Sequence, residues 1–272
     1  MTKLKNKLRK DLPTDYKLAT KKENPNGSYN NLGTLFPFLG EYGKAKEYVE
    51  KALAIKIQIG DKEGEASSYE NLGSVFQSLG EYDRGSQSYI EYHEKALAIR
   101  IHIGDKNGEA SSYGNLGTVF ISLAEYDKAK EYIEKALPVK IQIGDKQGEA
   151  SSYNNLGTVF QCLGEYDKAK EYLEKALAIR MQIGDKDGEA NSYGNLATLF
   201  LSLGDYGKAK GYLDQALSVQ IHIGDKQGEA RSYGNLGNIV VIMAKLKNIL
   251  GTPLPSEDKL VAKLEKQQIT QG

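Results

Sequence analysis

The sequence has little of what disulfide frameworks, metal sites and membrane spans require. Its 272 residues include one cysteine, three histidines and no tryptophan. A single Cys162 cannot form an internal disulfide, so we expect a reducing compartment. The apolar run Ile239–Met243 is far shorter than the roughly 20 residues that span a bilayer, and the N-terminus lacks the apolar core of a signal peptide. These absences predict a cytoplasmic protein with no membrane span.

The sequence has no excess of charge of either sign, because its formal net charge is +0. The charged residues are nevertheless unevenly distributed along the chain. Residues 1–22 carry eight Lys or Arg against two Asp, which leaves the rest of the chain acidic. An acidic body argues against nucleic acid as a partner. The basic head fits either contact with an anionic surface or a solubilising tail.

What the sequence has instead is an internal repeat. One leucine recurs with the same neighbours at spacings of 40, 44, 40, 40 and 40 residues, as Leu32, Leu72, Leu116, Leu156, Leu196 and Leu236. A fixed period of this length is typical of a stacked array, in which each unit contacts only its neighbours. We expect a basic tail at 1–24, an array at 25–245 of about five and a half repeats, and a tail or capping helix at 246–272.

Each repeat reads as two helices, which makes the expected fold class all-α. In the fourth repeat the helices are expected at about 146–163 and 165–183, separated by Gly164. Gly184 suits the left-handed position after a helix, and Asp185 suits the N-cap of the next one. Neither helix can bury its apolar face alone, so the units must stack.

The residue spacing that recurs in each unit is similar to that of the tetratricopeptide repeat. The residues that carry the resemblance in the fourth repeat are Tyr153, Leu156, Gly157, Phe160, Gly164, Tyr166, Ala169, Leu173 and Ala176. The resemblance implies a right-handed superhelix, or α-solenoid, that acts as a protein interaction scaffold. The 40-residue period resembles the Pins-type G-protein-signalling modulators and long animal arrays. Those modulators end in GoLoco motifs, and no GoLoco-like segment is present here.

Four departures from the repeat carry predictions. The segment 81–95 is four residues longer than its counterpart at 125–135, which predicts a helix one turn longer. The competing interpretation is a break at Gly85 with Ser88 and Glu91 as a capping box.

Pro138 should kink its helix at a cost of roughly 3 kcal/mol. Asn24–Gly27 and Pro37 should fray the first repeat. The last unit stops after one helix, and residues 256–268 are read as a capping helix or a tail.

Catalysis has little support in the sequence. His102 and His222 occupy a repeat position held elsewhere by Gln58, Gln142 and Gln182, which favours a surface role. There is no metal-ligand spacing, no nucleophile beside a base and no phosphate-binding loop. We therefore expect no enzyme activity, no cofactor and no metal.

The better candidate for function is a row of amides in the concave groove that the resemblance implies. Asparagine side chains donate and accept hydrogen bonds, so a row of them can hold the backbone of an extended peptide. The predicted groove residues are Asn31, Asn71, Asn115, Asn155, Asn195 and Asn235, with Thr118, Thr158, Thr198 and Arg231. Recent duplication, or bonding to an adjacent helix, would also explain the amides.

Specificity is expected from groove residues that vary between repeats, namely Gln77, Ile121, Gln161, Cys162 and Leu201. Arg231 is the one basic residue at its repeat position, where the others are Ser67, Ser111, Ser151 and Asn191. A neutral groove favours backbone-led binding over recognition of an acidic peptide. The leading hypothesis is thus a scaffold that binds an extended peptide of a protein partner. The alternatives are an oligomerising array that self-associates through its C-terminal end, and the sensor part of a larger signalling protein.

Overall fold

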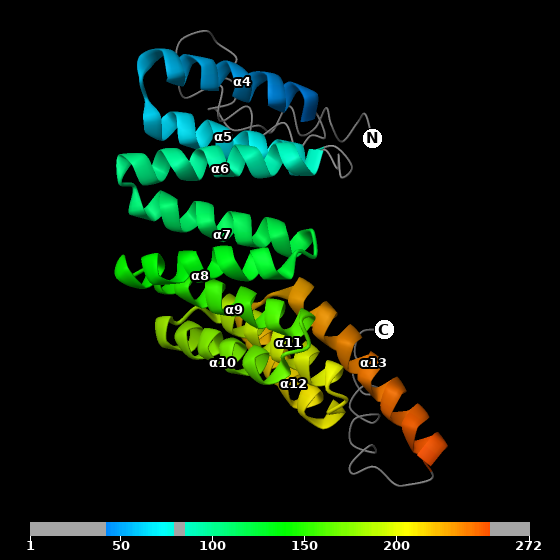
Figure 1. Cartoon of the computed structure of the whole chain (residues 1–272). Helices are drawn as coiled ribbons and strands as arrows, with labels where there is room; N and C mark the ends of the chain where they lie inside the picture. Colours follow the sequence, from blue (N-terminus) through cyan, green and yellow to red (C-terminus); the bar gives the residue numbers. More distant parts are fainter. Residues whose placement is uncertain (1–41, 79–84, 251–272) are drawn as a thin grey trace. The chain divides into compact units, whose positions relative to one another are not determined.

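The computed structural model describes residues 42–78 and 85–250, which form helices joined by tight turns. The chain divides into two compact units, the first ending at Leu163. The described helices of the first unit are α4 (Tyr42–Ile59), α5 (Lys62–Ser78), α6 (Gly85–Ile103), α7 (Lys106–Ser122), α8 (Tyr126–Gln142) and α9 (Lys146–Cys162). Those of the second unit are α10 (Tyr166–Ile183), α11 (Lys186–Ser202), α12 (Tyr206–Ile223) and α13 (Lys226–Leu250) (Figure 1). None of the described helices is long and apolar enough to cross a membrane.

The helix boundaries follow the predicted glycine and aspartate signals. Gly184 has φ 71° and ends α10 with its N–H bonded to the carbonyl groups of Arg180 and Met181. Asp185 then caps α11, because its carboxylate accepts a hydrogen bond from the backbone N–H of Gly188. The same aspartate bond opens α7 and α9. The period in the sequence therefore gives the helix ends to within a residue or two.

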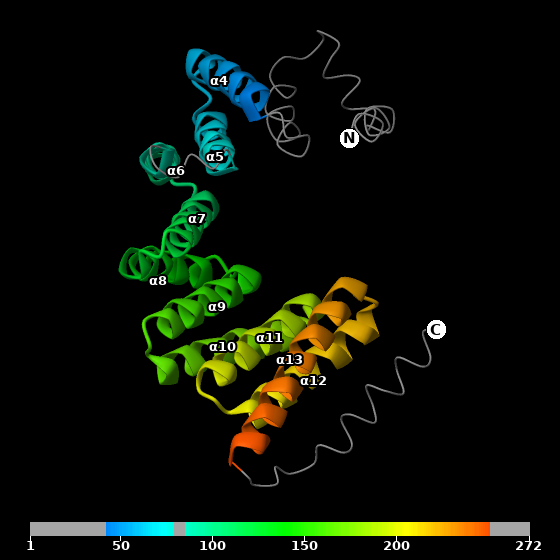
Figure 2. The ribbon, with the colours of Figure 1, turned by 90° about the vertical axis from the view of Figure 1, so that its right-hand side faces the viewer.

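In the first unit α5, α6, α7 and α8 form two layers. Figure 2 shows α6 and α8 on one side of the unit and α5 and α7 on the other. A small residue sets the spacing between layers: a Cβ added to Gly117 on α7 would lie 2.5 Å from Cγ1 of Ile133 on α8. Phe120 and Tyr132 stack across the same helix pair with ring centroids 5.3 Å apart. The glycine thus permits a close approach that the aromatic pair then covers.

The second unit uses the same scheme with a slightly larger residue at the contact. Ala197 on α11 stands in the place of Gly117, and it is buried with Phe200, Leu213 and Ile239 in one apolar cluster. Phe200 and Tyr212 stack with centroids 5.4 Å apart. The fold class, an all-α solenoid of helix-turn-helix repeats, is confirmed.

The longer segment of the second repeat lies partly outside the described residues. Within them α6 runs from Gly85 to Ile103 and has 19 residues, against 18 in α10 and α12. Residues 79–84, directly before it, are not described, so the helix one turn longer stays a prediction. The competing capping box is wrong, because Ser88 lies inside α6, and Glu91 forms an ion pair with Lys95 at 2.8 Å.

The remaining departures stay predictions. α8 continues through Pro138, whose side chain faces solvent; the predicted kink itself stays a prediction. The last described helix, α13, has 25 residues and ends at Leu250, where the described residues also end, so a last unit of one helix stays a prediction. The predicted fraying of the first repeat at 24–37, the tail at 1–24 and the capping helix at 256–268 lie outside the described residues. The proposed domain boundaries therefore stay predictions.

Candidate functional site

In the first unit the predicted asparagines lie on the exposed stripes of alternate helices. On α7 the buried residues include Ser112, Leu116, Val119 and Phe120, whereas Ser111, Asn115, Thr118 and Ser122 are exposed. Asn71 on α5 and Asn155 on α9 occupy the same repeat position and are half-buried. We call the stripes that carry Asn71, Asn115 and Asn155 the amide face.

The hydroxyl groups beside the asparagines are partly used by their own helices. Thr118 donates to the carbonyl oxygen of Gly114 at 3.0 Å, and Thr158 donates to that of Asn154 at 3.2 Å. Ser74 does the same toward Glu70 at 3.1 Å. Since each donor is spent on the helix backbone, these hydroxyls can offer a ligand only their oxygen as an acceptor.

The second unit carries the other described members of the predicted set. Asn195 on α11 is half-buried and Asn235 on α13 is exposed. Thr198 is exposed and donates to the carbonyl oxygen of Gly194 at 3.0 Å. Arg231 is exposed in the first half of α13. Asn31 lies outside the described residues.

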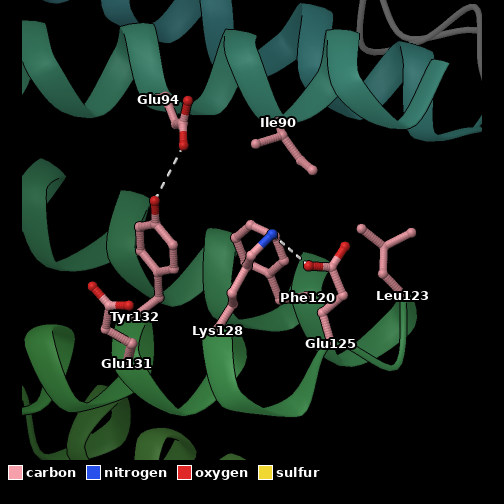
Figure 3. A pocket seen from close by; sticks show the side chains of 8 residues that line it. All are labelled: Ile90, Glu94, Phe120, Leu123, Glu125, Lys128, Glu131 and Tyr132. Atoms are coloured by element: carbon pink, nitrogen blue, oxygen red, sulfur yellow. Dashed lines mark hydrogen bonds and ion pairs between the residues drawn. The ribbon is translucent and has the colours of Figure 1, made fainter. Parts of the chain in front are cut away.

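A cavity of about 390 Å³ lies elsewhere in the first unit, between α6 and α8 and the end of α7. Figure 3 shows its lining, in which the Tyr132 hydroxyl donates to Glu94 at 3.2 Å and Lys128 pairs with Glu125 at 2.6 Å. Burial, with help from Glu94, raises the pKa of Tyr132 to about 12. Tyr132 therefore stays a neutral donor at physiological pH, and none of the predicted groove residues lines this cavity.

The histidines divide between surface and core. His102 and His222 are exposed, as expected. His93 is only 3% exposed, and its ring lies against α5, 2.7 Å from where a Cβ of Gly73 would stand. Among the described residues no group of His, Cys, Asp and Glu is placed to hold a metal ion.

The structure shows a second set of polar residues, lying between helices, that the sequence analysis did not predict. Arg100 on α6 is paired with Glu70 and with Asp105, each at 2.7 Å, and Glu70 also accepts from Ser112 at 2.8 Å. One repeat later, Lys140 bonds Ser152 at 3.1 Å. Equivalent serine contacts come from Arg180 and Gln220 in the second unit. The signal available in the sequence was a polar residue recurring every 40 positions within an otherwise apolar segment.

A family model for the tetratricopeptide repeat matches residues 26–84, 90–142 and 148–221. This is most of the chain. The chain belongs to the tetratricopeptide repeat family. The repeat geometry described above, with a small residue at the helix contact and paired aromatics beside it, accords with that membership.

Solved structures support the same fold. A putative kinesin light chain from Podosopora anserina with nearly identical repeats is 19% identical with a TM-score of 0.62, over 75% of this chain and 99% of that one. A signal transduction ATPase with a tetratricopeptide repeat sensor from Pyrococcus horikoshii is 19% identical with a TM-score of 0.63, over 84% and 40%. Aspartyl phosphate phosphatase F from Bacillus subtilis is 15% identical with a TM-score of 0.68, over 81% and 60%. No curated protein matches the sequence.

Proposed function

We propose that the chain is a non-enzymatic scaffold whose amide face binds an extended segment of a protein partner. The observation that carries the proposal is the recurrence of an asparagine at one repeat position, on the solvent-facing stripe of α5, α7 and α9. Tetratricopeptide repeats generally mediate protein–protein interaction, which supports the same function class. The resemblance to the Pins-type subtype is compatible with it.

The amides alone give modest affinity. A net hydrogen bond contributes about 0.5–1.5 kcal/mol, so three of them on the first unit contribute on the order of 3 kcal/mol. Micromolar binding requires about 8 kcal/mol. Side chains of the partner must supply the difference by burial against variable positions such as Gln77, Ile121 and Gln161, which are half-buried. The amides would then fix the path of the backbone, and the variable residues would select the partner.

Affinity capture from a native lysate, read by mass spectrometry, tests the proposal. The test variant combines Asn71→Ala, Asn115→Ala and Asn155→Ala. The matched control removes three exposed amides on α4, α8 and α10, helices that carry none of the asparagines, with Gln58→Ala, Gln142→Ala and Gln182→Ala. We expect a protein that is held by the wild type and by the control but lost from the test variant. Equal capture by all three, with unchanged circular dichroism, would remove the amide face from the mechanism.

A second candidate function is self-association through α13. Val241 and Ile242 are large apolar residues that remain exposed on this helix, and an exposed apolar surface favours stacking on another chain. Sedimentation equilibrium of the full chain, with Val241→Lys beside the wild type, tests it. A mass that rises with concentration in the wild type and not in the variant supports this candidate, and a constant monomer mass in both excludes it.

A further inference from the structure

The second repeat contains a complete carboxylate site made by the protein itself. The Glu70 carboxylate on α5 accepts a hydrogen bond from the Arg100 guanidinium at 2.7 Å and from the Ser112 hydroxyl at 2.8 Å. Arg100 comes from α6 and Ser112 from α7, so three consecutive helices meet at one anion. A cation and a hydroxyl that converge on one carboxylate satisfy both of its oxygen atoms.

The third repeat keeps the cation and the hydroxyl but lacks the carboxylate. Lys140 on α8 stands at the position of Arg100, and Ser152 on α9 stands at the position of Ser112. Their side chains are again in contact, with Nζ of Lys140 3.1 Å from Oγ of Ser152. The position of Glu70 is taken by Gly114, which has no side chain, and a Cβ there would lie 3.2 Å from Nζ of Lys140.

The missing partner leaves a buried ammonium group without a direct counter-charge. Lys140 is 9% exposed, and within the described residues it forms no ion pair. Burial lowers its pKa, and the nearby Asp145 acts in the opposite direction. An ammonium group in such surroundings gains from a carboxylate placed within hydrogen-bond distance.

Gly114 lies beside the amide face. Gly114 directly precedes Asn115, and its carbonyl oxygen accepts the hydroxyl of the exposed Thr118. A peptide held by Asn115 would therefore pass beside Gly114, with Lys140 and Ser152 next to it. All of these residues lie on α7, α8 and α9 of the first unit.

We propose that Lys140 and Ser152 form a subsite over Gly114 that receives a carboxylate of the bound peptide, in the way that Arg100 and Ser112 hold Glu70 one repeat earlier. This inference rests on the proposed peptide-binding function. It also changes the partner chemistry expected from the sequence, because the charge comes from the second helix of the repeat rather than from the face that carries the asparagines.

The test uses three immobilised decapeptide libraries built from uncharged residues. The first has a glutamate fixed at the centre and blocked ends, the second has a glutamine there and blocked ends, and the third has the glutamine and a free C-terminal carboxylate. Retention of the purified full chain is measured on each. We expect the first library to retain about tenfold more wild type than the second, as a charge-assisted hydrogen bond would produce. A preference for the third library instead would assign the subsite to a C-terminal carboxylate.

Two variants and one control connect the preference to the subsite. Lys140→Gln removes the charge, and the fold already accepts this residue, since Gln220 bonds Ser232 at 2.7 Å at the same repeat position. Gly114→Glu supplies an internal carboxylate that should occupy the subsite. Both are expected to abolish the carboxylate preference. Lys135→Gln, an exposed residue of the same helix that pairs with Glu131, should leave it unchanged.

The outcomes separate this inference from the function on which it rests. Equal retention on all three libraries, lost on replacing Asn71, Asn115 and Asn155 by alanine, would overturn the subsite and leave the amide face standing. A carboxylate preference that survives in Lys140→Gln would also overturn the subsite. A carboxylate preference that is lost in Lys140→Gln but kept when the three asparagines are replaced by alanine would support the subsite and contradict the role of the amides. Retention no greater than on bare support would overturn both.

Discussion

At the scale of single residues, His93 is the least favourable member of the core. It stands where the third and fourth repeats have Ile133 and Leu173, and its buried Nδ1 atom has no hydrogen-bond partner in the part of the chain that the structure describes. A buried polar atom left unpaired costs about 1–3 kcal/mol. We therefore expect His93→Leu to raise the free energy of unfolding by about 1–3 kcal/mol, measured by urea denaturation at pH 7. The exposed His102→Leu is the control and should change it little.

The same residue predicts a pH dependence. Burial lowers the pKa of His93 below that of the unfolded chain, although Glu70 opposes the shift. The unfolded state therefore binds the proton more readily, and stability is lost as pH falls below about 6.5. The stability difference between His93→Leu and wild type should grow between pH 7.5 and pH 5.5. A difference that stays constant over this window would show that His93 does not titrate differently in the two states.

The aspartate caps give a second residue-scale prediction. Asp185 accepts the N–H of Gly188 at 2.9 Å, whereas Glu165, at the N-cap of α10, makes no side-chain cap bond. Asp185→Ala should cost about 0.5–2 kcal/mol of stability, and Glu165→Ala should cost less than about 1 kcal/mol, because it loses only its exposed pair with Lys168. Thermal denaturation of both variants checks this, and equal losses would contradict it.

At the scale of elements, α8 is the helix with a proline in its interior. Pro138 removes the hydrogen bond that its N–H would donate to the carbonyl of residue 134, yet the helix continues to Gln142. Its exposed position on the helix is occupied by Ala178 in α10. We expect Pro138→Ala to stabilise the chain by up to about 3 kcal/mol and Ala178→Pro to destabilise it by a similar amount. Thermal denaturation of the reciprocal pair would contradict this if neither variant moved the melting temperature.

The elements were also the level best predicted from the sequence. The helix expected at 146–163 is Lys146–Cys162, because glycine and aspartate at a fixed period mark each end. The start of the helix after the longer segment has no such marker. Four extra residues can be placed within a helix or before it, and the repeat pattern alone does not place His93 in the core, where its ring packs against α5.

At the scale of the whole molecule, the repeat period predicted the fold class but not the buried polar contacts. Arg100 and Lys140 recur at the repeat period within apolar segments, but the period alone does not say which helices surround them. Their burial arises only when the helices of consecutive repeats close around them, as Ser112 and Ser152 show. The repeat period predicted which helices carry the asparagines of the candidate site. It could not predict the partner, because specificity depends on side chains that vary between repeats.

The most direct test of the central claim is the dissociation constant of a captured partner peptide, measured by calorimetry for the wild type, for the triple variant Asn71→Ala, Asn115→Ala and Asn155→Ala, and for the glutamine control. Loss of three hydrogen bonds of about 0.5–1.5 kcal/mol each predicts binding at least about tenfold weaker in the asparagine variant. The control should bind like the wild type. An asparagine variant that folds and binds the peptide within about twofold of the wild type would contradict the account.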